Sequence, residues 1–313
     1  MSIYVERIIE ADRDRIWELT QTPEMHERWD LRFTRIRYLP KVRAEDPQSF
    51  EYETRVGFLT ICGTGTTAGE RRATDGTSSS ALVFASSDPR SVIRKGSGYW
   101  RYVPEGEGRT RFITAYDYAV RWGAIGWILD RVLFRPLMAW ATAWSFDRLA
   151  MWASLGAAPE RSRQISLAQA TARITVAGIW LYEGIFPKLA GPRPEELMMT
   201  MRAGIPAGLA VAFVMGLGAL EVVLGVLVLA LWQRRWPLAV SAAAMVPALI
   251  GAACAAPELL AAPFNVVVIN WMVTSLSLVA LFLHEESVRA TRCRWSAYGK
   301  GVRGVASAGG NGE

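Results

Sequence analysis

The stretch Pro206–Trp232, PAGLAVAFVMGLGALEVVLGVLVLALW, decides the fold of this chain because it holds a single ionisable side chain, Glu221. At a rise of about 1.5 Å per residue, a helix of this length crosses a hydrocarbon core of about 30 Å. We therefore predict a transmembrane helix. Three further apolar runs surround it, at Leu167–Phe186, Pro237–Ala256 and Phe264–His284. The C-terminal half, residues 168–285, is predicted to be an all-α four-helix transmembrane bundle.

The N-terminal half is polar enough to fold in water. It begins with a strand signal at Ile3–Glu10, a helix capped by Asp12, and a short helical turn at Pro23–Trp29. Segments of alternating polarity follow, with turn signals between them, at Phe33–Tyr38, Ser49–Val56, Leu59–Thr67, Ser80–Ala85, Tyr99–Val103 and Thr110–Val120. A long helix is expected over Gly123–Leu155, with a kink or restart at Pro136. This order predicts an α+β domain, residues 1–155, joined to the bundle by a linker at 156–167.

Apolar side chains recur along the long helix at intervals of three and four residues. They are Ile125, Leu129, Val132, Leu133, Leu137, Trp140, Trp144, Met151 and Leu155. The main interpretation is that this stripe is buried against the sheet. Tryptophan is unusually frequent in the helix, which favours a second interpretation in which one edge lies in the membrane interface.

The net charge of +6 comes mainly from arginines near the ends of the apolar runs, so it indicates membrane orientation and not nucleic-acid binding. Eight basic residues flank one side, from Arg161 to Arg294, against Lys188, Arg193 and Arg202 on the other. This bias predicts a multi-pass protein of the cell membrane, the inner membrane in a bacterium, with both termini and the Gln233–Trp236 turn in the cytoplasm. The tail, residues 286–313, is basic and then rich in Gly and Ser, and we expect it to be disordered.

Several kinds of chemistry are not expected. The only histidines, His26 and His284, belong to different halves, so neither a histidine metal site nor a Ser-His-Asp triad can form. We predict no metal, no cofactor and no catalytic residue, and whether a reaction is catalysed stays open. Five polar residues in the soluble half are weak candidates, each expected to face solvent: Arg32, Glu51, Glu53, Asp117 and Tyr118.

The membrane half offers a more definite polar site. A charge at the depth of Glu221 costs about 2.5–3.5 kcal/mol, so this carboxyl group should be paired or functional. Glu183, Lys188 and Asn270 fall in the same half of the bundle, and Lys188 can reach back toward Glu183 or Glu221. These residues either hold the helices together, at about 0.6–2 kcal/mol per hydrogen bond, or form a substrate or proton site.

The N-terminal half resembles the SRPBCC superfamily of START-like, polyketide cyclase/dehydrase proteins. The resemblance rests on the order of elements and on Trp17-Glu18-Leu19-Thr20, Arg28-Trp29-Asp30-Leu31-Arg32-Phe33 and Trp144-Ser145-Phe146-Asp147-Arg148-Leu149. It implies a helix-grip fold, in which a sheet grips the C-terminal helix around a hydrophobic cavity for lipids, polyketides or other apolar molecules.

The C-terminal half, Ala168–Glu285, resembles the DoxX-like family of four-helix membrane proteins. The resemblance rests on Trp180-Leu181-Tyr182-Glu183-Gly184 with Pro187-Lys188, on the acidic residue of the second helix, and on the Asn-containing fourth helix. Members of the broader DoxX group are linked to quinone-coupled redox complexes, so the resemblance also suggests a membrane redox partner.

Together these features predict a protein that binds an apolar small molecule, lipid-like, polyketide-like or quinone-like, at the cytoplasmic face of the bilayer. Trp140 and Trp144, one helical turn apart, are the predicted cavity-lining residues. The alternative function is an accessory membrane subunit of a quinone-linked oxidoreductase. We also expect the segment Met1–Leu155 to fold when cut from the membrane half.

Overall fold

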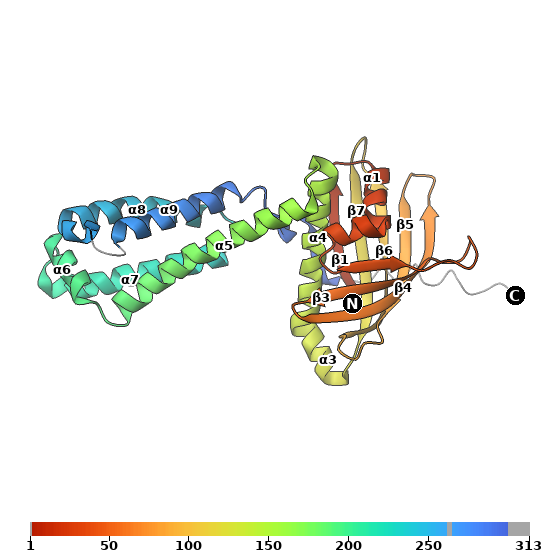
Figure 1. Ribbon diagram of the computed structural model, residues 1–313, viewed down its shortest axis with the longest axis horizontal. Coiled ribbons are helices and arrows are strands. Elements are labelled where there is room, and N and C mark those ends of the chain that lie inside the picture. Colours follow the sequence, from red (N-terminus) through yellow and green to blue (C-terminus); the bar gives the residue numbers. More distant parts are fainter. Residues whose placement is uncertain (1, 262–264, 300–313) are drawn as a thin grey trace. The chain divides into compact units, whose positions relative to one another are not determined.

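The computed structural model describes residues 2–261 and 265–299, and the chain divides into two compact units (Figure 1). Unit 1 consists of the chain up to Ser162 together with the residues from Val288 onward. Unit 2 is Arg163–Ser287.

Unit 1 is built on an eight-stranded antiparallel sheet in the order β2-β3-β4-β5-β6-β7-β1-β8. The strands are β1 Ser2–Ile9, β2 Arg35–Tyr38, β3 Ser49–Val56, β4 Leu59–Arg72, β5 Ser78–Ala85, β6 Ile93–Pro104, β7 Thr110–Val120 and β8 Arg294–Gly299. Two short helices, α1 (Arg13–Gln21) and α2 (Pro23–Trp29), separate β1 from β2. The predicted antiparallel sheet is confirmed.

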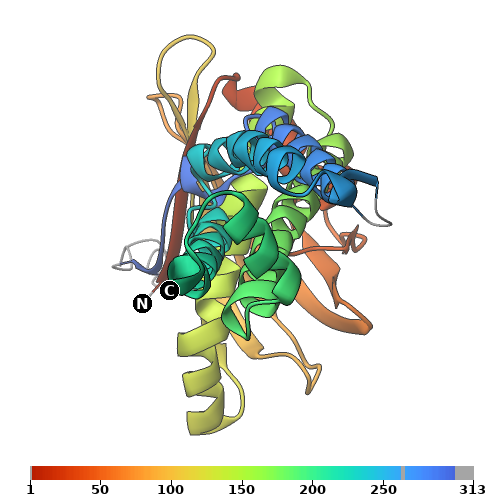
Figure 2. The same cartoon turned by 90° about the vertical axis from the view of Figure 1, so that its left-hand side faces the viewer.

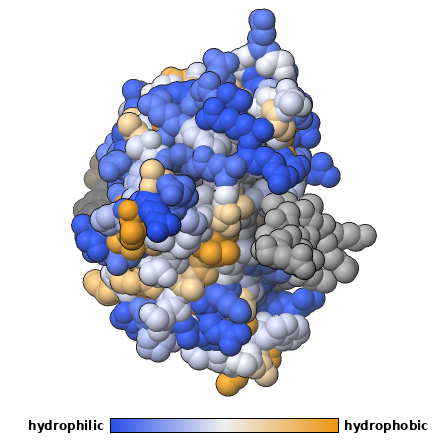
Figure 3. All heavy atoms as spheres, turned by 90° about the vertical axis from the view of Figure 1, so that its right-hand side faces the viewer, coloured by the Kyte–Doolittle hydropathy of each residue, from blue (hydrophilic) through white to orange (hydrophobic). Residues whose placement is uncertain are grey.

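The face of the molecule in Figure 3 is mostly hydrophilic, with small separate hydrophobic areas.

A long helical segment crosses the sheet of unit 1. It consists of α3 (Gly123–Leu129), a π-helical turn η1 (Asp130–Phe134) and α4 (Arg135–Leu155). Because Pro136 lacks an N–H group, it is tolerated in the first turn of α4, where the predicted restart occurs. The ring of Phe146 on α4 stacks on that of Phe112 on β7 at 4.5 Å between centroids, which fixes the helix on the sheet.

The face of α4 that packs on the sheet differs from the predicted one. Ala139, Ala143, Phe146 and Leu149 are fully buried in the core, whereas most of the expected stripe is exposed. The exposed members are Ile125, Leu129, Val132, Leu133, Leu137, Trp140 and Leu155. The prediction that this stripe is buried against the sheet is therefore wrong. Small side chains such as Ala139 and Ala143 let this part of the helix approach the strands closely, with Phe146 and Leu149 filling the core further along α4.

The tail contributes to unit 1. Residues Arg294–Gly299 form β8, which pairs antiparallel with β1 in the register Val5 opposite Trp295, and η4 (Ala290–Arg292) precedes it. The prediction of a disordered tail is wrong for 288–299, because β1 would otherwise leave an unpaired edge. The rest of that prediction, 300–313, lies outside the described residues.

The expected linker at 156–167 is also mostly helical. A single helix, α5 (Pro159–Gly184), begins three residues after Gly156, whose left-handed conformation (φ 66°) ends α4. Only the short turn between Leu155 and Pro159 connects the two helices.

Unit 2 is helical. It contains most of α5, then η2 Ile185–Leu189, α6 Pro194–Arg202, α7 Ala207–Ala230, α8 Trp236–Ala255, η3 Pro257–Ala261 and α9 Val266–Phe282. Two helices of the described residues, α7 and α8, are long and apolar enough to span a membrane, and α9 is a shorter apolar helix. Asn265 caps α9, since its Oδ1 accepts a hydrogen bond from the Val268 N–H at 3.1 Å. The helix α6 was not expected from the sequence.

Candidate functional site: a cavity in unit 1 and a charged cluster in unit 2

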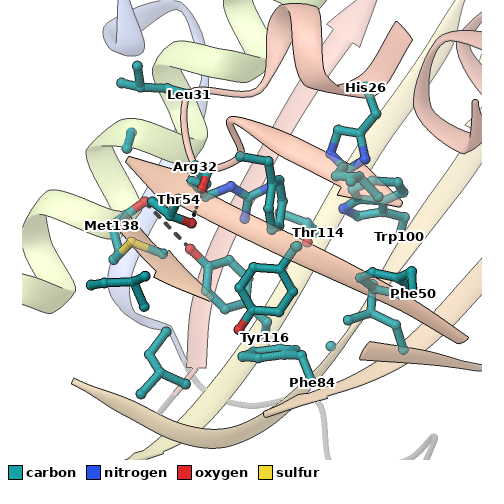
Figure 4. Close-up of a pocket in the computed structure, with 18 of the residues that line it drawn as sticks. His26, Leu31, Arg32, Phe50, Thr54, Phe84, Trp100, Thr114, Tyr116 and Met138 are labelled. Carbon is teal, nitrogen blue, oxygen red and sulfur yellow. Dashed lines mark hydrogen bonds between the residues drawn. The ribbon is translucent and has the colours of Figure 1, made fainter. Parts of the chain in front are cut away.

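A cavity of about 540 Å³ lies in unit 1 between the sheet and the long helix (Figure 4). Its volume is within the range of about 300–1,000 Å³ that is usual for small-molecule sites. Helix residues Phe134, Leu137, Met138, Trp140 and Ala141 form one wall. The opposite wall consists mainly of aromatic and aliphatic strand residues, among them Phe50, Tyr52, Leu82, Phe84 and Trp100.

Glycines on the central strands allow these rings to lie flat on the sheet. A Cβ atom at Gly65 would lie 2.3 Å from the ring of Phe50, and one at Gly96 would lie 2.5 Å from the ring of Phe84. Both separations are shorter than any real contact. The rings on the concave side of the sheet therefore depend on the missing side chains of their neighbours.

A buried ionic cluster closes one end of the cavity. Asp30, which ends α2, is 1 % exposed and accepts two hydrogen bonds from Arg32, from Nε at 2.9 Å and Nη2 at 2.6 Å. Nε2 of His26 lies 3.0 Å from the same carboxylate, one helical turn earlier. His26 and Arg32 line the cavity, whereas Asp30 lies behind them. The arrangement presents a held guanidinium group and an imidazole ring to the cavity.

The pKa values of this cluster follow from its burial and its pairing. Burial raises the pKa of Asp30, but the charge of Arg32 and the hydrogen bonds from His26 and Arg32 hold it well below its usual range. Burial lowers the pKa of Arg32, and Asp30 more than compensates. The pair is therefore ionised at neutral pH.

Tyrosines provide further polar groups in the cavity wall. Tyr116 on β7 lies 2.8 Å from the hydroxyl group of Thr142 on α4, and the Arg32 guanidinium lies 5.4 Å from its ring centroid. Burial raises the pKa of Tyr116, with a smaller opposing effect from Arg32. Burial also raises the pKa of Tyr52 to about 12. Both phenols are thus neutral at pH 7. Tyr116 donates its proton to Thr142, because the Thr142 hydroxyl itself donates to the carbonyl oxygen of Met138 at 2.7 Å.

The two predicted cavity residues lie in different places. Trp140 lines the cavity. Trp144, whose ring centroid is 6.4 Å from that of Trp140, is not among the described lining residues and packs against the core of unit 1, with Arg148 over its ring. A single helical turn is enough to move a side chain from the cavity wall to the core.

Sequence reasoning missed most of the polar end of the cavity. Arg32 was expected to face solvent, and His26, Asp30 and Tyr116 were not singled out. The signal that could have found them is the run Trp29-Asp30-Leu31-Arg32, in which opposite charges flank an apolar residue directly after a predicted helix. Two of the weak candidates lie on β7. Asp117 is not among the described lining residues and pairs with Arg135 at 3.0 Å. Tyr118 was expected to face solvent but is buried and donates to Asp130 at 2.7 Å.

In unit 2, a charged cluster joins η2, α6 and α7. Nζ of Lys188, which is 5 % exposed, lies 3.0 Å from Oε2 of Glu221 and 3.6 Å from Oε1 of Glu196. It also donates to the backbone carbonyl of Glu183 at 3.3 Å. Close approach of η2 to α7 is possible because a Cβ atom at Gly218 would lie 2.7 Å from that of Lys188.

The remaining predicted residue, Asn270, lies on the buried face of α9 and is 6 % exposed. In the part of the chain that the structure describes, no hydrogen bond links Asn270 to Lys188 or Glu221, and its Nδ2 has no partner. Near the middle of α5, the fully buried Arg173 donates to the carbonyl groups of Val228 and Leu231 at the end of α7. Its charge thus interacts with a helix C-terminus, which is favourable.

No metal centre is evident: among the described residues, no group of three or more His, Cys, Asp or Glu side chains is placed to hold a metal ion.

Comparison with known proteins relates each half of the chain to a different group. Residues 177–278 match the DoxX-like family. Unit 1 is similar to solved structures at low identity, including the protein TTHA0849 from Thermus thermophilus (15 % identity, 49 % of this chain and 99 % of that one, TM-score 0.38). Another is the Zhui aromatase/cyclase from a Streptomyces species (14 % identity, 49 % of this chain and 94 % of that one, TM-score 0.37).

A curated relative covers more of the chain. The uncharacterized membrane protein YndG of Bacillus subtilis (strain 168) is 42 % identical over 204 residues, which are 65 % of this chain and 74 % of YndG. The chain therefore belongs to the family of the membrane protein YndG and carries a DoxX-like domain at residues 177–278.

Proposed function

We propose that this protein binds an apolar small molecule, such as a lipid, a polyketide-like compound or a quinone, in the cavity of unit 1, which unit 2 anchors to the membrane. The observation that carries the proposal is the cavity itself, which has a volume of about 540 Å³ and a mainly apolar surface. An apolar ligand partitions into the bilayer, so anchoring raises its effective concentration at the cavity.

The polar end of the cavity narrows the ligand class. His26, Arg32 and Arg55 line the cavity, and none of its described lining residues is a carboxylate. The neutral phenol of Tyr52, which also lines the cavity, adds a hydrogen-bond donor. A ligand with a carbonyl or carboxylate oxygen at one end of an apolar body fits this distribution. At about 0.8 kcal/mol per buried methylene, roughly ten methylenes would contribute about 8 kcal/mol before association costs.

The test is to purify the full chain in detergent, extract it with organic solvent and identify co-purified molecules by mass spectrometry. Ala141→Phe, which places a ring in the cavity, should reduce the amount of extracted ligand. Ala44→Phe makes the same change on an exposed loop and should not. Equal amounts from the two variants, or no apolar molecule from the unaltered protein, would contradict the proposal.

We further propose that unit 2 crosses the membrane four times, through α5, α7, α8 and α9, with both termini in the cytoplasm. Strands β1 and β8 pair although they precede and follow unit 2, and this supports the placement of both flanks of unit 2 on one side of the membrane. This supports an even number of crossings. The arginines near the ends of the apolar helices favour the cytoplasmic side.

Orientation is tested with single cysteines in a variant lacking Cys62, Cys254 and Cys293. A membrane-impermeant maleimide should label Glu195→Cys in intact cells, and Ala44→Cys only after permeabilisation. Both positions are exposed. Native Cys293 is unsuitable as a reporter, because its thiol is buried and burial raises its pKa to about 12.

A second candidate function is that of an accessory subunit of a quinone-linked oxidoreductase. The buried pair of Lys188 and Glu221 favours it, because an ammonium group and a carboxyl group at this depth can exchange a proton or hold a quinone carbonyl. Quinol-dependent oxygen uptake should fall in membranes of a deletion strain. The native gene should restore it, and the Lys188→Met, Glu221→Leu double variant should not. Unchanged uptake in the deletion strain would remove this candidate.

A further inference from the structure

The helical segment from α3 to the first turns of α4 carries an exposed apolar stripe. Its members recur at intervals of three and four residues, as on one face of a helix. They are Ile125 (76 % exposed), Ile128 (56 %), Leu129 (36 %), Val132 (75 %), Leu133 (59 %), Leu137 (52 %) and Trp140 (41 %). Figures 1 and 2 both show α3 at one tip of unit 1. A stripe of this length on a soluble surface would be unfavourable, so it needs an apolar environment.

The charges around the stripe indicate what that environment is. Asp130 is the only acidic residue between Trp122 and Trp140, and it is 5 % exposed, with Arg135 Nε at 2.8 Å and the Tyr118 hydroxyl at 2.7 Å. The exposed surface of the segment thus carries no negative charge. Arg131 is exposed and its guanidinium lies 5.6 Å from the ring centroid of Trp127, itself 57 % exposed.

Exposed tryptophan, branched aliphatic residues and an arginine, on a segment that has no exposed acidic residue of its own, are typical of helices that lie in the interfacial layer of a bilayer. Anionic headgroups attract such an arginine. A bilayer is also always within reach of this chain, because α7 and α8 are candidate membrane spans of the same polypeptide.

The stripe continues into the wall of the cavity. Leu137 and Trp140 belong to both, and Phe134, Met138 and Ala141 follow on the cavity side of the same helical segment. A molecule leaving the acyl-chain layer beside the stripe would meet apolar side chains all the way to the cavity.

We propose that the apolar stripe of unit 1 lies in the interfacial layer of the bilayer, with Arg131 at the headgroups, and that the cavity exchanges its ligand directly with the bilayer along Leu137 and Trp140. The second part rests on the proposed function, whereas the first part does not.

The contact is tested on the full chain in vesicles of phosphatidylethanolamine and phosphatidylglycerol. An environment-sensitive fluorophore is attached to a single cysteine, in a background lacking the three native ones. Ile128→Cys reports on the stripe. Glu107→Cys is the control, because it is exposed in the turn before β7, whose other end leads to α3. We expect a lipid-borne spin label to quench the probe at position 128 and aqueous iodide to quench the probe at 107.

Two results would overturn the contact. Quenching of position 128 by iodide to the same extent as 107 would place the stripe in water. Quenching of position 128 by neither agent would mean that protein covers the stripe, either unit 2 or a second copy of the chain. Neither readout requires a bound ligand, so failure of the contact is distinguishable from failure of the proposed function.

The exchange route is tested by the rate at which a fluorescent fatty acid, anthroyloxy-stearate, moves from vesicles to the reconstituted protein. Val132→Asp places a charge in the stripe, and Val42→Asp makes the same change at a loop residue that is 94 % exposed. Transfer should be slowed by the first substitution only, with unchanged probe affinity at equilibrium. Equal transfer rates would overturn the route. If the unaltered protein binds none of the fatty acid although the lipid-borne spin label quenches position 128, the exchange route and the proposed function would be overturned, but not the contact of the stripe with the bilayer.

Discussion

Asp147 on α4 and Arg292 on η4 form an ion pair of 3.1 Å across a sequence separation of 145 residues. The carboxylate is fully buried. It also forms an ion pair with Arg7 on β1 at 3.2 Å and accepts a hydrogen bond from the backbone N–H of Arg289 at 2.8 Å. One side chain therefore joins the first strand, the long helix and the returning tail of unit 1. Cys293 adds a contact in the same place, from its thiol to the carbonyl oxygen of Ala143 at 3.1 Å.

We expect Asp147→Asn to lower the stability of unit 1 by about 3 kcal/mol, because it leaves two arginines without their buried counter-charge. Thermal unfolding of the purified full chain, followed by circular dichroism, measures the effect. Glu160→Gln is the matched control, since it breaks the exposed pair with Arg28 and should cost at most about 1 kcal/mol. Equal losses from the two variants would show that Asp147 does not hold the tail.

The segment Met1–Leu155 should not fold by itself, contrary to the expectation from sequence. It lacks β8 and η4, so the edge of β1 and the carboxylate of Asp147 lose their partners. A chain in which residues 1–162 are joined to 288–299 by a flexible Gly/Ser linker should fold. Circular dichroism and a cooperative melting transition compare the two. A cooperative transition of Met1–Leu155 at the temperature of the joined chain would contradict this prediction.

Acid should weaken unit 1 through Asp30. The pKa of Asp30 in the folded state is lower than its value of about 3.9 in an unfolded chain. The contribution of Asp30 to the free energy of unfolding is therefore complete above about pH 3.9 and is lost as the pH falls below it. Asp30→Asn should therefore lower the melting temperature at pH 7 and reduce the decline below about pH 4. The measurement is the difference in melting temperature between the variant and the unaltered protein, taken from pH 7 to pH 3. A difference that stays constant over this range would exclude Asp30 as the titrating group.

In unit 2, Glu221→Leu should lower stability in detergent by about 3 kcal/mol, because the buried Lys188 then loses its 3.0 Å ion pair and keeps the longer one with Glu196 at 3.6 Å. The double variant Lys188→Met, Glu221→Leu should recover much of this loss. A double-mutant cycle on melting curves gives the coupling energy, expected at about 0.5–3 kcal/mol. Additive single effects would mean that the two side chains do not interact.

Strands β1 to β7 and the long helical segment of unit 1 could be predicted from the sequence, because alternation and helical period are local patterns. Which face of a helix packs on the sheet depends on residues far away in the sequence. Val132 and Leu133 have the period of a core face, yet Ala139 and Ala143 occupy the core because they allow a closer approach to the sheet. In the same way, Arg294–Gly299 looks like part of a basic tail, and only the open edge of β1 makes it a strand.

The buried ion pair of Asp30 and Arg32 beside the cavity likewise could not be predicted from the sequence. Arg32 and Asp30 are two positions apart, which is typical of exposed charges on a strand or turn. Their burial depends on where α2 ends and on how the sheet curves over them. The proximity of Lys188 to Glu221 was within reach of sequence reasoning, since Lys188 follows the first predicted membrane helix closely enough to reach back toward Glu221.

The returning strand β8 has a consequence for biosynthesis. The roughly 125 residues of unit 2 (163–287) take about 6–25 s to synthesise at 5–20 residues per second. During that interval β1 keeps an open edge and Asp147 has no arginine from the tail. The strands of unit 1 that are made first thus wait for the last strand of their sheet. On the proposed topology, that strand arrives only after the intervening helices have been inserted with both flanks on the same side. Completion of the sheet would then act as a check on membrane insertion, and a nascent chain that fails it would expose an unpaired edge to chaperones and proteases.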